Sequence, residues 1–178
     1  MISALIKGED SAYRHIIAKY REPVVRLCRG FTGSAVDAED LAQDIFIEVF
    51  RSIDRFKGRS SLSTWIYRIA VNKSINFVRD RSKRDHDDYA SAAEIEDNYY
   101  SADSHMMQKD HARALHSAVE RLPESQKTAF VLSKYEDMSY SEISAIMETT
   151  VSSVESLLFR AKRNLQKYLY DYYEKNIK

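Results

Sequence analysis

Glycine and proline are scarce in this chain, which has four glycines and two prolines among 178 residues. Both residues interrupt regular elements, so their scarcity excludes a turn-rich chain. Together with the many Ala, Leu, Glu, Lys and Arg residues, it predicts an all-α protein. Runs of alternating β-branched and aromatic residues between turn signals are also missing, which argues against a sheet.

Cysteine is almost absent. The single Cys28 cannot form an internal disulfide, and no CxxC pair is present to bind zinc. Its neighbours Val25 and Leu27 indicate a small core residue and not a reactive thiol. His111 and His116 are five residues apart, a spacing that does not put them on one helical face. We therefore predict no metal site and no cofactor.

Long apolar runs are missing as well. No stretch of about 18 apolar residues occurs, so no membrane span is expected. The N-terminal sequence MISALIKGED lacks the long apolar stretch after a basic start that marks a signal peptide. These absences predict a soluble, cytoplasmic protein without membrane insertion.

The net charge is zero, but the charges are segregated along the chain. Residues 51–84 carry ten Lys and Arg against two acids, whereas residues 85–104 carry seven acids and no Lys or Arg. Because salt screens charges beyond about 10 Å, the local field matters more than the total. A nucleic-acid partner therefore remains compatible with a neutral chain.

The acidic segment also suggests how the chain is divided. The stretch Asp85–Ser104 is polar and lacks helical periodicity, as a linker does. A chain of this length forms one large or two small domains. We predict an N-terminal domain over residues 1–84, a flexible acidic linker over 85–108 and a C-terminal domain over 109–178.

Three helices are predicted in the N-terminal domain. The first covers Asp10–Phe31, and Pro23 is expected to bend or split it. The second starts near Asp37, where acidic residues suit a helix N-terminus. The third covers Leu62–Arg84. Helical spacing predicts one buried stripe of Leu41, Ile45, Val49 and Ile53, and a second stripe of Trp65, Ile69, Asn72 and Asn76.

Four helices are predicted in the C-terminal domain. Pro123 is expected in the first turn of one of them. Ser139 and Glu142 have the spacing of a capping box, which opens a short helix. After the turn METT, Thr150 is a suitable N-cap for the last helix. A capped short helix, a brief turn and a long helix outline a helix-turn-helix.

Two stretches carry a family resemblance. Asp37–Arg84 contains the string TWIYRIAVN, and Arg121–Leu165 contains the predicted helix-turn-helix. In order and spacing they resemble regions 2 and 4 of the extracytoplasmic-function (ECF) sigma factors of the sigma-70 family. The resemblance implies a region 2 bundle of three to four helices and a four-helix region 4 domain. The acidic linker is either a solubilising spacer or, by the resemblance, a strand along the RNA exit path.

The resemblance also implies a function. It implies a bacterial transcription initiation factor that has no catalytic activity of its own. Such a factor binds core RNA polymerase, at the β′ clamp and the β flap, and directs it to promoter DNA. An anti-sigma factor that covers the clamp-binding and DNA-facing surfaces is expected as a regulator.

The helix around DLAQDIFIEVF is the implied clamp-binding element. Its acidic face fits a basic partner surface and would orient the complex. A solvated amphipathic helix is the alternative interpretation. The implied polymerase contacts are Asp40, Gln43, Asp44, Phe46 and Glu48.

The basic segment 51–84 is the implied promoter-opening surface. Phosphate neutralisation supplies salt-dependent affinity, and unpaired bases stack on aromatic rings. The loop Phe56–Ser63 corresponds to the one that receives a flipped base. Trp65 can equally be a core residue, whereas Asn72 on an apolar helix side would need a hydrogen-bond partner. The implied contacts to the −10 element are Lys57, Arg59, Ser60, Ser61, Trp65, Tyr67, Asn72, Lys73, Arg79 and Arg81.

The segment Thr150–Leu165 is the implied recognition helix for the −35 element. Glu155 and Leu157 depart from the family pattern, which often has a basic residue and an arginine there, and Glu148 replaces a frequent glycine. A carboxylate at Glu155 can accept from cytosine N4, repel phosphates or pair with Arg160. The implied contacts are Thr150, Ser152, Ser153, Glu155, Ser156, Phe159, Arg160, Lys162 and Arg163.

Two other classes of protein are alternatives to this interpretation. A dimeric helix-turn-helix regulator with an N-terminal helical sensor would need a dimer surface and a palindromic site. It would leave the basic, aromatic surface and the acidic helix without a role. An all-α enzyme is disfavoured because no Gly-rich phosphate loop, ligand cluster or nucleophile signature is present.

Overall fold

The computed structural model describes residues 2–87 and 105–176. Every regular element in these two ranges is a helix, and no strand occurs in them. The predicted all-α fold is therefore confirmed. Among the described residues, no helix combines the length and the apolar character needed to cross a lipid bilayer.

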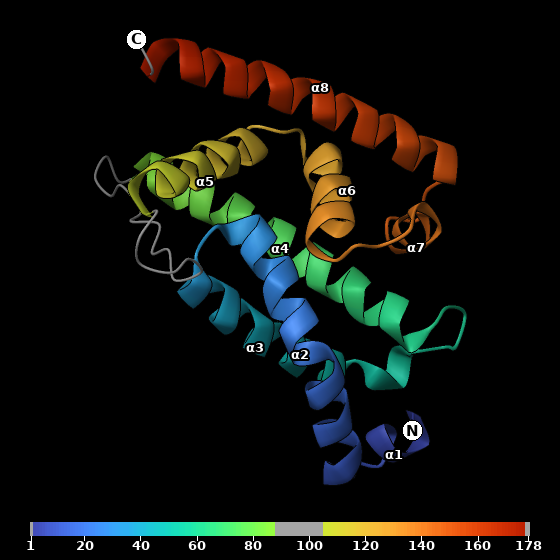
Figure 1. The fold of residues 1–178 in the computed structure, drawn as a ribbon. Helices are drawn as coiled ribbons and strands as arrows, with labels where there is room; N and C mark the ends of the chain where they lie inside the picture. Colours follow the sequence, from blue (N-terminus) through green and yellow to red (C-terminus); the bar gives the residue numbers. More distant parts are fainter. Residues whose placement is uncertain (1, 88–104, 177–178) are drawn as a thin grey trace.

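The helices form two groups that pack against each other. The N-terminal group has α1 (Ile2–Ile6), α2 (Asp10–Thr32), α3 (Ala35–Arg51), the 3-10 helix η1 (Ile53–Arg55) and α4 (Leu62–Asp87). The C-terminal group has α5 (His105–Glu120), α6 (Glu124–Tyr135), α7 (Tyr140–Ile146) and α8 (Val151–Asn176). The long α8 packs on α5, α6 and α7, which lie between it and the N-terminal group (Figure 1).

The predicted linker is helical at both of its ends. Helix α4 continues through Asp87, and α5 already begins at His105. The rest of the predicted linker, residues 88–104, lies outside the described residues, and so does the flexibility expected of it.

Helix α2 is continuous through Pro23, so the predicted split is not observed. Proline removes the hydrogen bond to the carbonyl of Lys19. Buried residues on both sides of it, including Tyr20, Val24 and Leu27, anchor the helix against its neighbours. The helix ends at Gly33, whose φ of 69° is the left-handed conformation typical of a C-cap glycine.

Helix α3 begins at Ala35, two residues before the predicted start. Ser34 is its N-cap, and the serine side chain accepts a hydrogen bond from the backbone N–H of Asp37 at 3.2 Å. Asp37 therefore lies in the first turn, where a carboxylate stabilises the helix dipole. The predicted stripe of Leu41, Ile45, Val49 and Ile53 is confirmed, because all four side chains are buried.

The buried stripe predicted for α4 is wrong, because the buried residues lie at other positions of the helix. Trp65 and Ile69 are only half-buried, and Asn72 and Asn76 are exposed. The buried residues of α4 are instead Ile66, Tyr67, Ala70, Val71 and Ser74. The reason is that α4 contacts α2 and α3 on one side and α7 on another. A helix with apolar neighbours on several sides has no single apolar stripe for the sequence to display.

One hydrophobic cluster runs through both helix groups. Leu27 and Phe31 of α2 belong to the same cluster as Val131, Leu132 of α6 and Ile143 of α7, and all five are buried. A second, smaller cluster joins α5, α6 and α8. Pro123 takes the N-cap position of α6, one residue before the first-turn position predicted for it.

A buried carboxylate lies where the two groups meet. The Glu136 side chain is 2% exposed, and its Oε2 accepts a hydrogen bond from the Tyr67 hydroxyl at 3.0 Å. Arg26 lies 3.3 Å from both carboxylate oxygens, but its Nε is not aligned for a hydrogen bond to Oε1. Burial raises the pKa of Glu136 above its usual 4.5, against the opposing effects of Tyr67 and Arg26.

The raised pKa of Glu136 predicts a pH dependence of stability. The folded state holds this proton more tightly than the unfolded state, so the stabilisation is complete below 4.5 and is lost as pH rises through the folded pKa. We expect the free energy of unfolding of the wild type to fall, relative to Glu136→Gln, as pH rises above 4.5 and through the raised pKa of Glu136. Urea denaturation of both proteins across this range measures the difference.

The matched control is Glu22→Gln. Glu22 is the exposed partner of the same Arg26, at 3.8 Å. This substitution should leave the pH dependence of unfolding close to that of the wild type. A gap between wild type and Glu136→Gln that stays constant with pH would contradict the expectation.

Candidate nucleic-acid and polymerase interfaces

The outer face of α3 carries three of the five predicted polymerase contacts. Asp40, Gln43 and Asp44 are exposed. Glu48 is half-buried and its carboxylate lies 3.5 Å from the ammonium group of Lys73 on α4. The exposed set therefore presents two carboxylates and an amide on one stretch of helix.

Phe46 differs from the other predicted polymerase contacts because it is buried, at 7% exposure. Its ring packs against Phe50, with centroids 6.1 Å apart. It still borders a shallow hollow between α2 and α3, together with Ile17 and Ile47, which are both exposed. Neither isoleucine is among the predicted polymerase contacts, although Ile47 interrupts the polar face of α3 in the sequence.

The loop before α4 exposes its cations. Lys57 and Arg59 are both exposed beside Gly58, whose φ of 69° requires a residue that tolerates the left-handed region. Ser60 is half-buried, and Ser61 acts as the cap of α4, since its hydroxyl accepts the N–H of Thr64 at 3.0 Å. The cap at Ser61 thus fixes the point at which the loop ends and α4 begins.

Trp65 lies in the first turn of α4 and is half-buried. Its ring packs against Phe56 at a centroid distance of 5.4 Å. One side of the ring packs on the loop while the rest remains accessible, and the contact of Trp65 with DNA stays a prediction. Phe56 and Trp65 together fix the loop relative to α4.

The remaining polar candidates of α4 are placed differently from what the sequence suggested. Asn72 is exposed, so its amide is not a packing group and needs no buried partner. Arg81 pairs with Asp37 of α3 at 2.8 Å, and Arg79 donates to Asn76 at 2.9 Å. Two cations of the basic segment thus have partners within the protein itself.

Tyr67, a predicted −10 contact, is buried. It is 6% exposed, and its hydroxyl donates to Glu136 of the C-terminal group. Burial raises the pKa of this phenol, with the Glu136 charge as the next cause. In this arrangement of the two groups Tyr67 cannot reach DNA.

The helix-turn-helix forms as predicted. The Ser139 hydroxyl accepts the N–H of Glu142 at 3.3 Å, and the Glu142 carboxylate accepts the N–H of Ser139 at 2.9 Å, which completes the capping box. The Ser139 hydroxyl also donates to this carboxylate at 2.7 Å, and this bond, followed by the one from the backbone N–H of Ser139, lowers the pKa of Glu142. Thr150 caps α8 by accepting the N–H of Ser153 at 3.1 Å. Short α7 and long α8 are therefore both started by side-chain caps.

Glu148 makes the turn between α7 and α8 with a φ of 53°. This left-handed conformation is uncommon for a residue other than glycine, asparagine or aspartate. Its carboxylate lies 2.8 Å from Arg68 of α4. The same guanidinium also donates two hydrogen bonds to the carbonyl of Ala145, at 2.6 and 3.1 Å. The turn is thereby attached to α4.

The predicted −35 contacts occupy two flanks of α8. Ser152, Ser156 and Arg160 share one flank, at i, i+4 and i+8, and are all exposed. They border a shallow hollow together with Ser153 and Leu157. This flank is polar and carries one cation.

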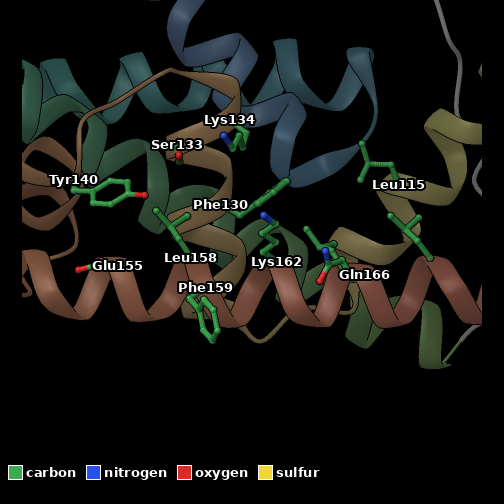
Figure 2. A pocket seen from close by; sticks show the side chains of 12 residues that line it. Leu115, Phe130, Ser133, Lys134, Tyr140, Glu155, Leu158, Phe159, Lys162 and Gln166 are labelled. Atoms are coloured by element: carbon green, nitrogen blue, oxygen red, sulfur yellow. The ribbon is translucent and has the colours of Figure 1, made fainter.

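The second flank carries Glu155, Phe159 and Lys162, which are exposed at i, i+4 and i+7. These residues line a groove of about 580 Å³ between α8 and the helices α5 to α7. Figure 2 shows Leu158 pointing toward α6 and the Phe159 ring pointing away from it. Arg163 is exposed as well.

The departure at Leu157 has a packing explanation. This side chain is half-buried and packs against the main hydrophobic cluster beside Val154. Val154, Ala161 and Leu165 are buried, whereas Leu157 and Leu158 are partly exposed at the edges. The core-facing stripe of α8 is therefore too narrow to bury all five residues.

Sequence reasoning missed three residues that join the two helix groups, namely Arg68, Lys127 and Glu136. The ammonium group of the buried Lys127 donates to the carbonyl of Phe31 at the end of α2, at 3.0 Å, and burial lowers its pKa. Tyr67 and Glu136 are 69 residues apart in the chain. No local pattern marks such partners.

Comparison with known proteins gives the chain a family. The model of sigma-70 region 2 matches residues 16–84, and that of sigma-70 region 4 matches residues 112–165. The RNA polymerase sigma-H factor of Pseudomonas aeruginosa is 29% identical over 95% of this chain and 92% of its own length. The ECF RNA polymerase sigma-E factor of Haemophilus influenzae is 30% identical over 93% of this chain and 92% of its own length.

Solved structures share the fold. CnrH, in complex with the cytosolic domain of CnrY, has a TM-score of 0.70 at 19% identity and covers 96% of this chain and 95% of its own. The sigma factor RpoE of Bartonella quintana, in complex with the anti-sigma factor NepR, has a TM-score of 0.65 at 22% identity. It covers 89% of this chain and 97% of its own. Both family regions and full-length relatives agree, and the chain belongs to the extracytoplasmic-function sigma factors of the sigma-70 family.

Proposed function

We propose that this sigma factor places its two helix groups on separate promoter elements while α3 holds the polymerase. The observation that carries the proposal is the doubly capped α7–turn–α8 unit, whose long helix presents exposed Ser152, Ser156 and Arg160. The protein supplies recognition and binding and performs no chemistry of its own. It acts in the cytoplasm, where the polymerase is.

We assign the β′ clamp to the outer face of α3. Asp40, Gln43 and Asp44 are exposed there, next to the hollow bordered by Ile17 and Ile47. Carboxylates orient a basic partner, and exposed apolar side chains add burial when the partner docks. Phe46 is buried under this surface, so only the edge that borders the hollow can contact the partner.

We assign the −10 element to the loop before α4 and to the first half of α4. Lys57 and Arg59 are free to meet phosphates, and the Trp65 edge is accessible for stacking with an unpaired base. Ser61 keeps the loop in place through its cap. Lys73, Arg79 and Arg81 serve phosphates only after they leave Glu48, Asn76 and Asp37.

We assign the −35 element to the exposed N-terminal part of α8. Ser152, Ser156 and Arg160 face the base edges, and Arg163 meets a phosphate. Glu155 lies at the border between this surface and the groove. Its carboxylate can accept from cytosine N4, which makes it a specificity residue.

The groove beside α8 is the proposed site for the β flap. Its lining includes Phe130, Leu158 and Leu165, with Lys134 and Lys162 as charged members (Figure 2). An apolar helix with acidic flanks fits this chemistry. The related sigma factor RpoE was solved with an anti-sigma factor, and we extend that mode of control to this protein.

The assignment of α3 predicts a loss of polymerase binding in Asp44→Lys. Reversing an exposed interface charge slows association, so the rate constant for binding core polymerase should fall on the order of tenfold at low salt and less at high salt. Stopped-flow binding with labelled core polymerase measures this rate. Asp54→Lys changes another exposed acid outside the surface, and an equal effect of both variants would refute the assignment.

The assignment of α8 predicts different behaviour for Glu155→Gln and Arg163→Gln. Loss of a base contact should relax specificity at one −35 position by about 1–3 kcal/mol, whereas loss of a phosphate contact should weaken all sequences alike. Transcription from templates with a randomised −35 region, followed by sequencing of the transcribed templates, separates the two patterns. An unchanged sequence preference in Glu155→Gln would remove this residue from base recognition.

A further inference from the structure

The first helix lies outside both family regions. Helix α1 covers Ile2–Ile6, whereas the match to sigma-70 region 2 begins at residue 16. A helix of five residues is not stable by itself, because one turn fixes several backbone dihedral angles for very few hydrogen bonds. The packing of Leu5, which is 1% exposed, therefore holds α1 in place. Neither the polymerase surface nor the DNA surfaces proposed for this protein include this helix.

A tight turn and one side-chain hydrogen bond fold α1 back onto α2. Gly8 has a φ of 76°, and its N–H donates to the carbonyl of Leu5 at 3.0 Å. The hydroxyl of Tyr13 on α2 donates to the same carbonyl at 3.1 Å. The Tyr13 ring packs on Phe50 near the end of α3, with centroids 4.6 Å apart. Tyr13 therefore joins α1 to both α2 and α3.

Helix α1 also packs on η1, which leads directly into the loop before α4. Leu5 and Ile53 of η1 are buried in the same hydrophobic cluster. The N–H of Phe56 donates to the carbonyl of Ile53 at 3.1 Å, and the Phe56 ring packs on Trp65. A continuous series of contacts thus connects Leu5 to the loop that is proposed to contact the −10 element.

The turn η1 has little else to hold it. Ile53 is its one buried residue, whereas Asp54 and Arg55 are exposed. On the side of α3, the Ser52 hydroxyl donates to the carbonyl of Glu48 at 2.6 Å. A segment with few buried apolar contacts opens locally at a low cost in free energy. The position of the loop therefore depends on how firmly Ile53 is packed.

We propose that α1 is a brace for the loop before α4, and that Leu5 and Tyr13 are positioning residues, which fix η1 and thereby hold Phe56 and Trp65 where an unpaired base can stack. This inference rests on the proposed −10 surface and adds the element that positions it. A binding site has to be held within about 0.5 Å of its productive geometry by the packing around it. A loop that has to be ordered during binding also costs affinity.

The single tryptophan of the chain gives a direct measure of the loop. Leu5→Ala removes the buried side chain, and Tyr13→Phe removes the hydroxyl while it keeps the ring on Phe50. We expect acrylamide to quench the fluorescence of Trp65 about twofold more efficiently in Leu5→Ala than in the wild type, with a smaller increase in Tyr13→Phe.

Two variants serve as controls for this measurement. Leu5→Met conserves the volume of the side chain and should give nearly the quenching of the wild type. Leu122→Ala removes a buried leucine from the second hydrophobic cluster, which contains no residue of α1 or η1. It should lower stability without changing the quenching of Trp65. If circular dichroism shows that Leu5→Ala is unfolded, Tyr13→Phe carries the same comparison.

The second measurement is promoter opening. Permanganate, which oxidises unpaired thymines, is applied to a genomic DNA fragment that the wild type transcribes with core polymerase. At saturating core polymerase, Leu5→Ala should reduce thymine reactivity about three- to tenfold below that of Leu122→Ala, and Leu5→Met should recover most of it. The affinity for core polymerase should stay near that of the wild type, because Leu5 does not border the hollow between α2 and α3.

Stronger quenching of Trp65 and weaker opening in Leu5→Ala, with recovery of both in Leu5→Met, would support the brace. Quenching and opening equal to those of Leu122→Ala would overturn it, because Leu5 would then be an ordinary core residue. Parallel losses of opening and of core-polymerase affinity would overturn it as well. If the wild type itself opens no DNA, the proposed function fails, and the role of α1 in opening fails with it.

Discussion

The arrangement of the whole protein depends on α2, which packs on two sides at once. One side contacts α3 and α4, and the other receives α6. Val24 and Leu27 are fully buried, and Gly30 lets α6 approach closely. Because α6 is joined by short turns to α7 and α8, this single approach fixes where the helix-turn-helix lies relative to α4. The accessible part of each proposed interface follows from it.

Charge pairing neutralises part of the basic segment on α4. Arg81 pairs with Asp37, Lys73 with Glu48, and Arg68 with Glu148. Each pair joins α4 to another element. In the −10 interface that we propose, phosphates would compete with these carboxylates, so DNA binding would be coupled to rearrangement of the pairs. The exposed Lys57 and Arg59 in the loop carry no such requirement and are suited to the first encounter with DNA.

Features set by residues close together in the sequence were predicted correctly. Features that depend on packing against a distant helix were not. The capping box of Ser139 and Glu142 and the N-cap at Thr150 formed as expected, because each involves residues three positions apart. Ser34 has the same spacing from Asp37 and could have been found in this way. The stripe of α4 was out of phase because that helix is covered on several sides, and Asn72 consequently faces solvent.

The sequence by itself determined the helices, their caps, the helix-turn-helix and the family, since these depend on short-range patterns and on motifs such as TWIYRIAVN. Only the tertiary structure decided which candidate residues are accessible. Tyr67 is buried because Glu136, 69 residues later, lies over it, and Arg68 is occupied by Glu148. The physical reason is that burial depends on how two distant surfaces fit, and this fit leaves no periodic trace in either segment.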